Sequence, residues 1–156
     1  MNIAIIVYSQ TGNTIAVAEK FKEVMAVSEH NITIEKISVQ EKVEPGKTDY
    51  HFESKPEIND YDMIVFGSPV QAFSLTSVME CYLDQLDNLQ DKEVACFVTK
   101  RLPFYWTGGI RAIKQMKKIL ESKGAKVQET GIIRWTKKKR EEDINDVLNR
   151  FKGIIS

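Results

Sequence analysis

Several features are scarce in this sequence, and each scarcity argues against a class of protein. Among 156 residues there are only two cysteines, Cys81 and Cys96, and both lie in segments of apolar periodicity. A disulfide framework is therefore not indicated, and we expect reduced core thiols in a cytoplasmic protein. No apolar stretch approaches the length of a membrane span, and the first nine residues have no basic leader. We expect neither a membrane segment nor a signal peptide.

Metal ligands and repeats are also scarce. The two histidines, His30 and His51, show no spacing typical of metal ligands, so no metal site is expected. Internal repeats, low-complexity stretches and linkers are missing. The hydrophobic content of 42% and the charged content of 28% are ordinary for a soluble globular protein. We therefore expect a single domain over residues 1–156.

The net charge is zero, but the charges are unevenly distributed. Residues 1–98 carry 16 acidic and 7 basic side chains, whereas residues 99–156 carry 6 acidic and 15 basic ones. Such asymmetry can indicate nucleic-acid binding. The only dense basic run, residues 137–140, is followed directly by three acidic residues, as is typical of a solvated loop beside a helix start. We expect no nucleic-acid partner.

What remains is an alternation of strands and helices. Apolar runs and alternating patterns predict five strands, at residues 2–8, 32–37, 62–67, 93–99 and 126–135. Helical spacing of apolar residues predicts four helices, at residues 14–28, 77–86, 108–124 and 141–155. Residues 38–58 contain Pro45, Gly46 and Pro56 among scattered charges, and they predict no long helix.

This order is typical of an α/β fold, in which a doubly wound parallel sheet lies between two layers of helices. The two most apolar strands, 2–8 and 62–67, are expected at the centre, and the alternating strand 32–37 at an edge. In such sheets, ligands bind beyond the carboxyl ends of the strands, where the strand order reverses. Three loops of unusual composition are expected there, at residues 9–14, 68–75 and 100–109.

The first of these loops reads SQTGNT and joins a strand to a helix. Backbone N–H groups at a helix start converge on a point of partial positive charge that suits a phosphate. The hydroxyls of Ser9, Thr11 and Thr14 add donors. Gly12 permits a tight turn, and Asn13 tolerates a left-handed conformation. The loop contains no Lys or Arg and no glycine pattern of a triphosphate or dinucleotide site. It therefore indicates either one phosphate held by neutral dipoles or a simple helix cap.

The same letters closely resemble a known family. IVYSQTGNT is similar to the phosphate loop of flavodoxins, FGSPV at 66–70 resembles their second loop, and residues 98–109 stand where their third loop lies. The resemblance covers essentially the whole chain and is most specific in the first loop. It implies a short-chain flavodoxin-like fold with five parallel strands in the order 2-1-3-4-5 and a bound FMN.

The resemblance also implies which residues bind FMN. Six residues of the first loop would cradle the phosphate: Ser9, Gln10, Thr11, Gly12, Asn13 and Thr14. The second loop would run along the flavin ring with Ser68, Pro69, Val70, Gln71, Ala72 and Phe73, where Gln71 replaces a frequent aromatic. The third loop would contribute Thr99, Lys100, Arg101, Tyr105, Trp106, Gly108 and Gly109. Of these, Tyr105 or Trp106 would cover the outer ring face.

The function stays open between classes. In one, the protein is an electron carrier, and redox partner proteins dock over the exposed flavin edge of a monomer or weak dimer. In another, it is an FMN-dependent reductase using NAD(P)H or a quinone; an interaction module without flavin is a third. The loops contain no evident catalytic acid, base or nucleophile, which favours the carrier. Lys100, Arg101, Arg111 and Lys114 would bring positive charge toward the ring, for an anionic dinucleotide or an acidic partner.

Overall fold

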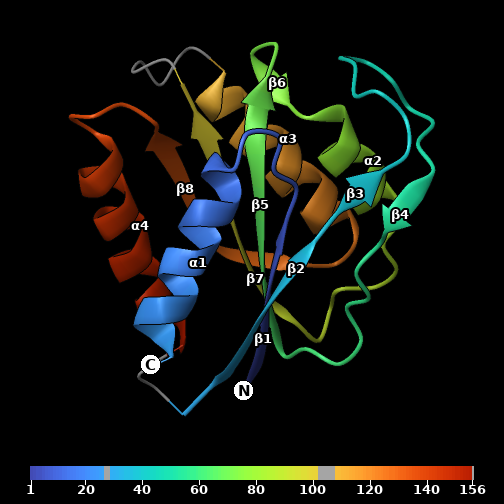
Figure 1. Cartoon of the computed structure of the whole chain (residues 1–156). Coiled ribbons are helices and arrows are strands. Elements are labelled where there is room, and N and C mark those ends of the chain that lie inside the picture. The colour runs from blue at the N-terminus through green and yellow to red at the C-terminus, as the bar shows by residue number, and fades with distance from the viewer. Residues whose placement is uncertain (27–28, 102–107, 156) are drawn as a thin grey trace.

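The structure is a computed structural model that describes residues 1–26, 29–101 and 108–155. Its main sheet contains β1 (Asn2–Val7), β2 (Asn31–Lys36), β5 (Met63–Gln71), β6 (Ser74–Leu75), β7 (Glu93–Lys100) and β8 (Lys126–Arg134). The helices of the described part are α1 (Asn13–Met25), α2 (Ser77–Asp84), α3 (Gly109–Ser122) and α4 (Arg140–Ile155) (Figure 1). Two short strands, β3 (Ser38–Val39) and β4 (Phe52–Ser54), form a separate antiparallel pair. Within the described ranges, no helix combines the length and the apolar character that a membrane span needs.

Five parallel strands form the sheet in the order β2-β1-β5-β7-β8. Counted along the chain without the short strands, this is 2-1-3-4-5, so the predicted fold class is confirmed. β5 lies at the centre with β1 beside it, and β2 is an edge strand, as the apolar patterns predicted. From β1 the chain continues to β2 on one side of the sheet, and from β5 it continues through β7 to β8 on the other side. The strand order therefore reverses between β1 and β5.

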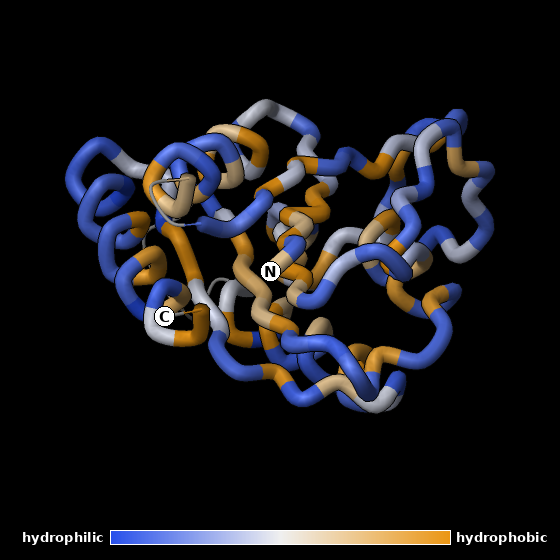
Figure 2. The backbone as a smooth tube through the Cα atoms, turned by 90° about the horizontal axis from the view of Figure 1, so that it is seen from below, coloured by the Kyte–Doolittle hydropathy of each residue, from blue (hydrophilic) through white to orange (hydrophobic). Residues whose placement is uncertain are grey.

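Two apolar clusters lie on opposite faces of the sheet. One is covered by α1 and α4, where the Phe21 ring makes edge contacts with Phe97 at 5.3 Å and Phe151 at 5.6 Å between ring centroids. The other is covered by α2 and α3. Seen from below, the hydrophobic segments gather between hydrophilic outer turns (Figure 2). This burial on both faces explains why the central strands are apolar throughout.

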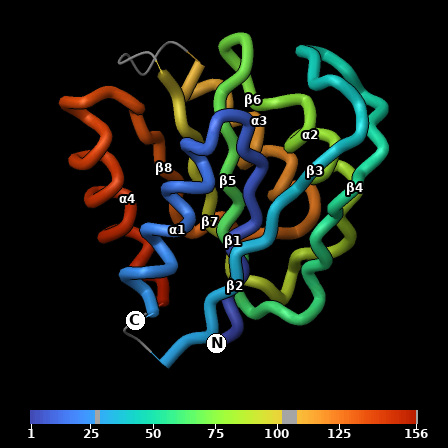
Figure 3. Tube along the Cα trace, in the orientation of Figure 1, coloured from blue at the N-terminus to red at the C-terminus, as the bar shows by residue number. Residues whose placement is uncertain are grey.

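The crossover from β2 to β5, residues 37–62, contains no helix. It runs with β3 and β4 over the α2 side of the molecule (Figure 3). Ile37, Tyr50 and Ile58 are buried in the cluster on that face. The Tyr50 hydroxyl is 2.7 Å from the hydroxyl of Ser77, the first residue of α2. The expectation that no long helix lies in residues 38–58 is confirmed. The apolar side chains of this segment cover part of the sheet face in place of a helix.

The largest departure from the sequence prediction lies at residues 68–75, which were expected to be a loop. β5 continues to Gln71, and the chain turns back into β6 with Gln71 paired to Ser74. The two turn residues, Ala72 and Phe73, have φ values of 47° and 63°. Positive φ at both central residues defines a type I′ hairpin turn, which usually carries Asn or Gly. Because neither residue gives that signal, the sequence did not predict the hairpin.

The tip of this hairpin packs against the start of α3, and this contact gives a first prediction. A Cβ at Gly108 would lie 2.5 Å from the Cα atom of Phe73, and the φ of Gly108 is +101°. Gly46 has a φ of +78° but no atom within 4 Å of such a Cβ. We expect Gly46→Ala to cost about 1–2 kcal/mol of unfolding free energy through its backbone alone. Gly108→Ala should cost about 1–3 kcal/mol more, because the backbone must also shift.

Urea unfolding of the two variants measures this difference. Equal losses would contradict a hairpin tip that is held rigidly against α3.

Candidate functional site

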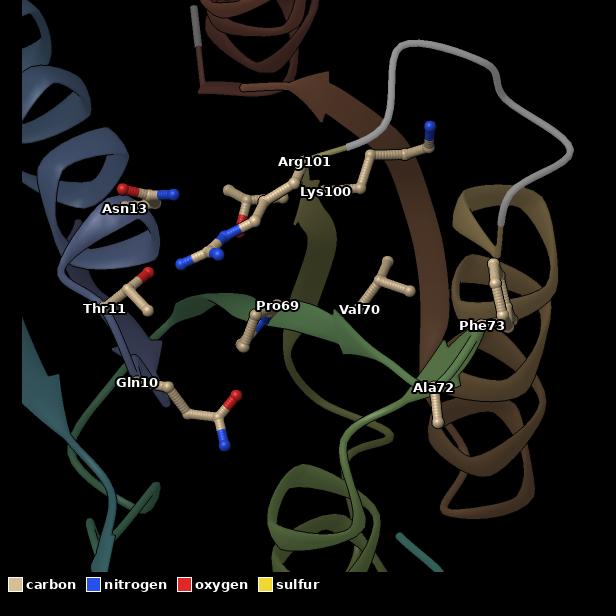
Figure 4. Close-up of a pocket in the computed structure, with 10 residues that line it drawn as sticks. Gln10, Thr11, Asn13, Pro69, Val70, Ala72, Phe73, Lys100 and Arg101 are labelled. Carbon is tan, nitrogen blue, oxygen red and sulfur yellow. The ribbon is translucent and has the colours of Figure 1, made fainter. Parts of the chain in front are cut away.

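A cleft of about 280 Å³ opens at the carboxyl ends of the strands, beside the point where their order reverses (Figure 4). Its walls come from the β1–α1 loop, the β5–β6 hairpin and the end of β7. The lining residues are Gln10, Thr11, Asn13, Pro69, Val70, Ala72, Phe73, Thr99, Lys100 and Arg101. The structure therefore brings together ten of the nineteen residues that the resemblance implied. Segments of all three predicted loops meet here.

The first wall is the start of α1. Gly12 adopts a left-handed conformation with φ of 89° and directly precedes the helix. The first N–H groups of a helix have no intrahelical acceptor, and they point out of its N-terminus. The Ser9 hydroxyl oxygen accepts a hydrogen bond from the backbone N–H of Ile15, at 3.4 Å between nitrogen and oxygen. Ser9 and Gly12 thus shape this turn behind the lining residues Gln10, Thr11 and Asn13, and the turn suits an anion.

Thr14 takes a different position from the one expected. It is 1% exposed, and its hydroxyl lies 2.9 Å from that of Thr99, also buried. Thr14 is not among the residues that line the cleft, and its role as a phosphate donor stays a prediction. The pair of hydroxyls joins α1 to β7 behind the cleft. This contact fixes the first loop relative to Thr99, which does line the cleft.

Arg101 supplies the positive charge that the first loop lacks. Its guanidinium group extends from the end of β7 into the cleft, between Asn13 and Thr11 on one side and Pro69 on the other (Figure 4). A guanidinium group is always charged and donates in a fork that matches phosphate. A cation from the third loop therefore lies beside the neutral donors of the first loop. The sequence placed Arg101 at the site but gave no sign that it faces the first loop.

The second wall is the β5–β6 hairpin. Pro69, Val70, Ala72 and Phe73 line the cleft with apolar atoms. Phe73 is 60% exposed, although it is one of the largest apolar side chains of the protein. A flat, apolar wall of this kind suits the face or edge of an aromatic ring.

Two predicted residues of the same hairpin turn away from the cleft. The buried Ser68 hydroxyl donates to the carbonyl of Pro69 and also pairs with the hydroxyl of Thr76, each at 3.0 Å. The Gln71 side chain accepts the backbone N–H of Ser77 at 3.2 Å. Both side chains hold the hairpin to the start of α2. Neither residue lines the cleft, and their assignment to the flavin wall stays a prediction.

Lys100 is the most unusual charged residue at the site. It lines the cleft, yet the residue is only 4% exposed. Its ammonium nitrogen lies on the side away from Arg101 and Thr11 (Figure 4). Burial, and then the guanidinium of Arg134, lower the pKa of Lys100, while the carboxylate of Asp143 opposes that shift. The expectation that Lys100 brings positive charge to the flavin stays a prediction, with its ammonium group directed away from Arg101 in this structure.

The remaining predicted residues lie in the third loop, either directly after residues 102–107, which the structure does not describe, or among them. Gly108 and Gly109 are buried and serve close packing. A Cβ at Gly109 would lie 2.9 Å from Cδ of Lys100, just as one at Gly108 would meet the hairpin tip. Neither glycine lines the cleft. The predicted ring-stacking residues Tyr105 and Trp106 lie outside the described residues.

The geometry fits the parts of FMN. The helix start and the Arg101 guanidinium face the same space, as a phosphate dianion requires. The apolar hairpin wall continues from there at Pro69 and Val70, where a ring can lie. The residues present therefore match a molecule with one anionic end and one flat end.

Comparison with known proteins decides the family. Residues 1–138 match the family model described as NADPH-dependent FMN reductase. The chain belongs to this family. A search of curated proteins finds no significant match. With the family and the fold, the predicted flavodoxin-like character and the FMN cofactor class are confirmed.

Solved structures share the fold over nearly the whole chain. A putative flavoprotein from Bacteroides eggerthii DSM 20697 is 18% identical with a TM-score of 0.68, covering 95% of this chain and 96% of its own. Oxidised Flavodoxin 2 from Bacillus cereus is 21% identical with a TM-score of 0.66, covering 98% and 99%. A flavoprotein in complex with FMN from Lactobacillus acidophilus NCFM is 17% identical with a TM-score of 0.63, covering 94% and 97%. At these identities the likeness concerns the fold.

Proposed function

We propose that this chain binds FMN in the cleft and passes electrons from NADPH through it to a small acceptor. The observation that carries the proposal is the Arg101 guanidinium facing the start of α1, next to an apolar wall, where the strand order reverses. Membership of the NADPH-dependent FMN reductase family supports NADPH as the electron donor.

The residues of the cleft have separate roles in this proposal. The start of α1 and Arg101 bind the phosphate. The hydrogen bond between Thr14 and Thr99 holds α1 in place against β7. Pro69 and Val70 orient the ring along the hairpin. When bound, FMN supplies the redox chemistry, so that NADPH, one proton and a quinone become NADP⁺ and a quinol by transfer of two electrons.

The lining suits hydride chemistry. Among the described residues that line the cleft there is no Asp, Glu, His or Cys. A hydride carries its own electrons and proton, so the protein need only exclude water and set the distance between the rings. An apolar wall beside an anion site meets that requirement without an acid or a base.

Anaerobic mixing of the FMN-loaded protein with NADPH tests the proposal. The flavin absorbance should bleach, and a quinone should restore it with turnover. A flavin that stays oxidised in excess NADPH would contradict NADPH as the direct donor.

A second candidate is an electron carrier between redox partner proteins that dock over the flavin edge. It is favoured by the exposed Phe73 at the rim of the cleft. In that case the flavin is reduced by NADPH only when a separate protein reductase is added. The anaerobic mixing experiment therefore distinguishes the two candidates.

We also propose a cytoplasmic location. Cys81 and Cys96 are free and buried. Burial raises the pKa of the Cys96 thiol to about 12, which makes it unreactive. Unpaired, inert thiols are typical of proteins that work in a reducing compartment.

A further inference from the structure

A second hollow lies along the exposed face of α3, and we call it the α3 groove. It measures about 480 Å³ and is lined by Ile110, Arg111, Lys114, Gln115 and Lys118. Its three cations are spaced i, i+3 and i+7, so they lie on one side of the helix. Ile110 is an apolar side chain that is 45% exposed among them. The groove thus combines positive charge with an apolar contact.

These cations have no counter-charge close by. In the described ranges, none of Arg111, Lys114 and Lys118 forms an ion pair within 4.0 Å. The only acidic residue of α3 is Glu121, near its end. Since the whole chain has a net charge of zero, this is a local concentration and not a general excess. Three exposed, unpaired cations in one groove attract a compact anion.

The α3 groove begins where the rim of the cleft ends. Phe73 lines the cleft, and its backbone packs against Gly108, two residues before Ile110. Next to it, the N–H of Leu75 in β6 donates to the side chain of Gln115 in the groove, at 2.8 Å. These contacts fix the hairpin against α3. Through these contacts the hairpin links a wall of the cleft to the helix that carries the groove.

We propose that the α3 groove binds the adenosine 2′-phosphate end of NADPH. This inference rests on the proposed use of NADPH in the cleft. The 2′-phosphate is a compact dianion that can accept from the Arg111 fork and from two ammonium groups. Arg111 lies in the first turn of α3, where the helix dipole adds favourable potential. Ile110 offers an apolar contact for adenine. NADH lacks this phosphate, so the groove selects NADPH.

The first test uses adenosine 2′,5′-bisphosphate as a probe, with 5′-AMP as the comparison, by titration calorimetry. The wild type should bind the bisphosphate at least roughly tenfold more tightly than 5′-AMP, and the difference should shrink as salt is added. R111Q/K114Q/K118Q should abolish the difference. Equal binding of the two probes by the wild type would overturn the proposal. The groove cations would then be assigned to contact with an acidic protein partner.

The matched control removes the same charge elsewhere. Lys22, Lys117 and Lys126 are exposed and lie outside the groove, so K22Q/K117Q/K126Q changes net charge equally. It should keep wild-type probe affinity. If it loses as much as the groove variant, the effect is general charge and the proposal fails. K114Q alone should give an intermediate loss, which keeps the test valid should the triple variant fold poorly.

The nucleotide preference gives an independent readout. The ratio of kcat/KM for NADPH over NADH should fall roughly tenfold in R111Q/K114Q/K118Q, while the NADH value and FMN affinity stay unchanged. If the wild type oxidises NADPH but the variant keeps the ratio, the groove assignment is wrong and the proposed function stands. If FMN-loaded wild type oxidises neither nucleotide, the proposed function fails. The probe titration then decides whether the groove still binds the bisphosphate.

Discussion

Replacing Asp143 with alanine should lower the free energy of unfolding by about 3–5 kcal/mol, because it removes one partner of a buried ion pair. The Asp143 carboxylate accepts from the Arg134 side chain at 2.8 and 2.9 Å and from the Arg134 backbone N–H at 2.9 Å. The two side chains are only 15% and 7% exposed, for Arg134 and Asp143. Without the carboxylate, the half-buried Arg134 and the buried Lys100 beside it lose this negative charge.

Asp146 provides the control for this prediction. It lies one turn further along α4 and pairs with Arg150 at 3.3 Å, but its side chain is 68% exposed. Asp146→Ala should cost about 0.3–0.5 kcal/mol, as is usual for an exposed i,i+4 pair. Urea unfolding of both variants measures the difference. Similar small losses for the two would show that the Arg134–Asp143 pair does not anchor α4 to β8.

Replacing Arg101 with glutamine should weaken FMN binding by about 1.5–3 kcal/mol, the worth of a hydrogen bond to a charged group. The guanidinium faces the start of α1 across the cleft. In the proposed binding mode the phosphate lies there, and FMN carries a phosphate whereas riboflavin does not. Riboflavin affinity should therefore stay unchanged in the variant. Added salt should reduce the difference, since Arg101 is exposed.

Fluorescence titration with both flavins measures this effect. Lys117→Gln, which removes an exposed charge outside the cleft, should leave both affinities at wild-type values. If Arg101→Gln weakens riboflavin and FMN equally, Arg101 contacts the ring and not the phosphate.

The fold could be predicted because its signals are local. Uninterrupted apolar runs indicated the buried strands, and the alternation in residues 32–37 indicated the edge strand β2. Pro45, Gly46 and Pro56 correctly indicated a crossover without a long helix. The SQTGNT loop marked the start of α1 by its small polar residues.

Side-chain directions at the site could not be predicted, because they depend on contacts between distant segments. Thr14 and Thr99 are 85 residues apart, and the hydrogen bond between their buried hydroxyls could not be read from either segment alone. Lys100 is covered by α3 and meets the charges of Arg134 and Asp143, which no local pattern shows. The hairpin turn at Ala72 lacks the glycine or asparagine that would have marked it. Loop membership could be inferred from sequence, but orientation could not.

The central claim is that the cleft binds FMN by its phosphate. Titration of the flavin-free protein with FMN and with riboflavin, followed by flavin fluorescence, tests it most directly. The helix start and Arg101 together should make FMN bind at least roughly a hundredfold more tightly than riboflavin, the worth of two charge-assisted contacts. Equal affinities for the two flavins, or no binding of FMN, would contradict the account.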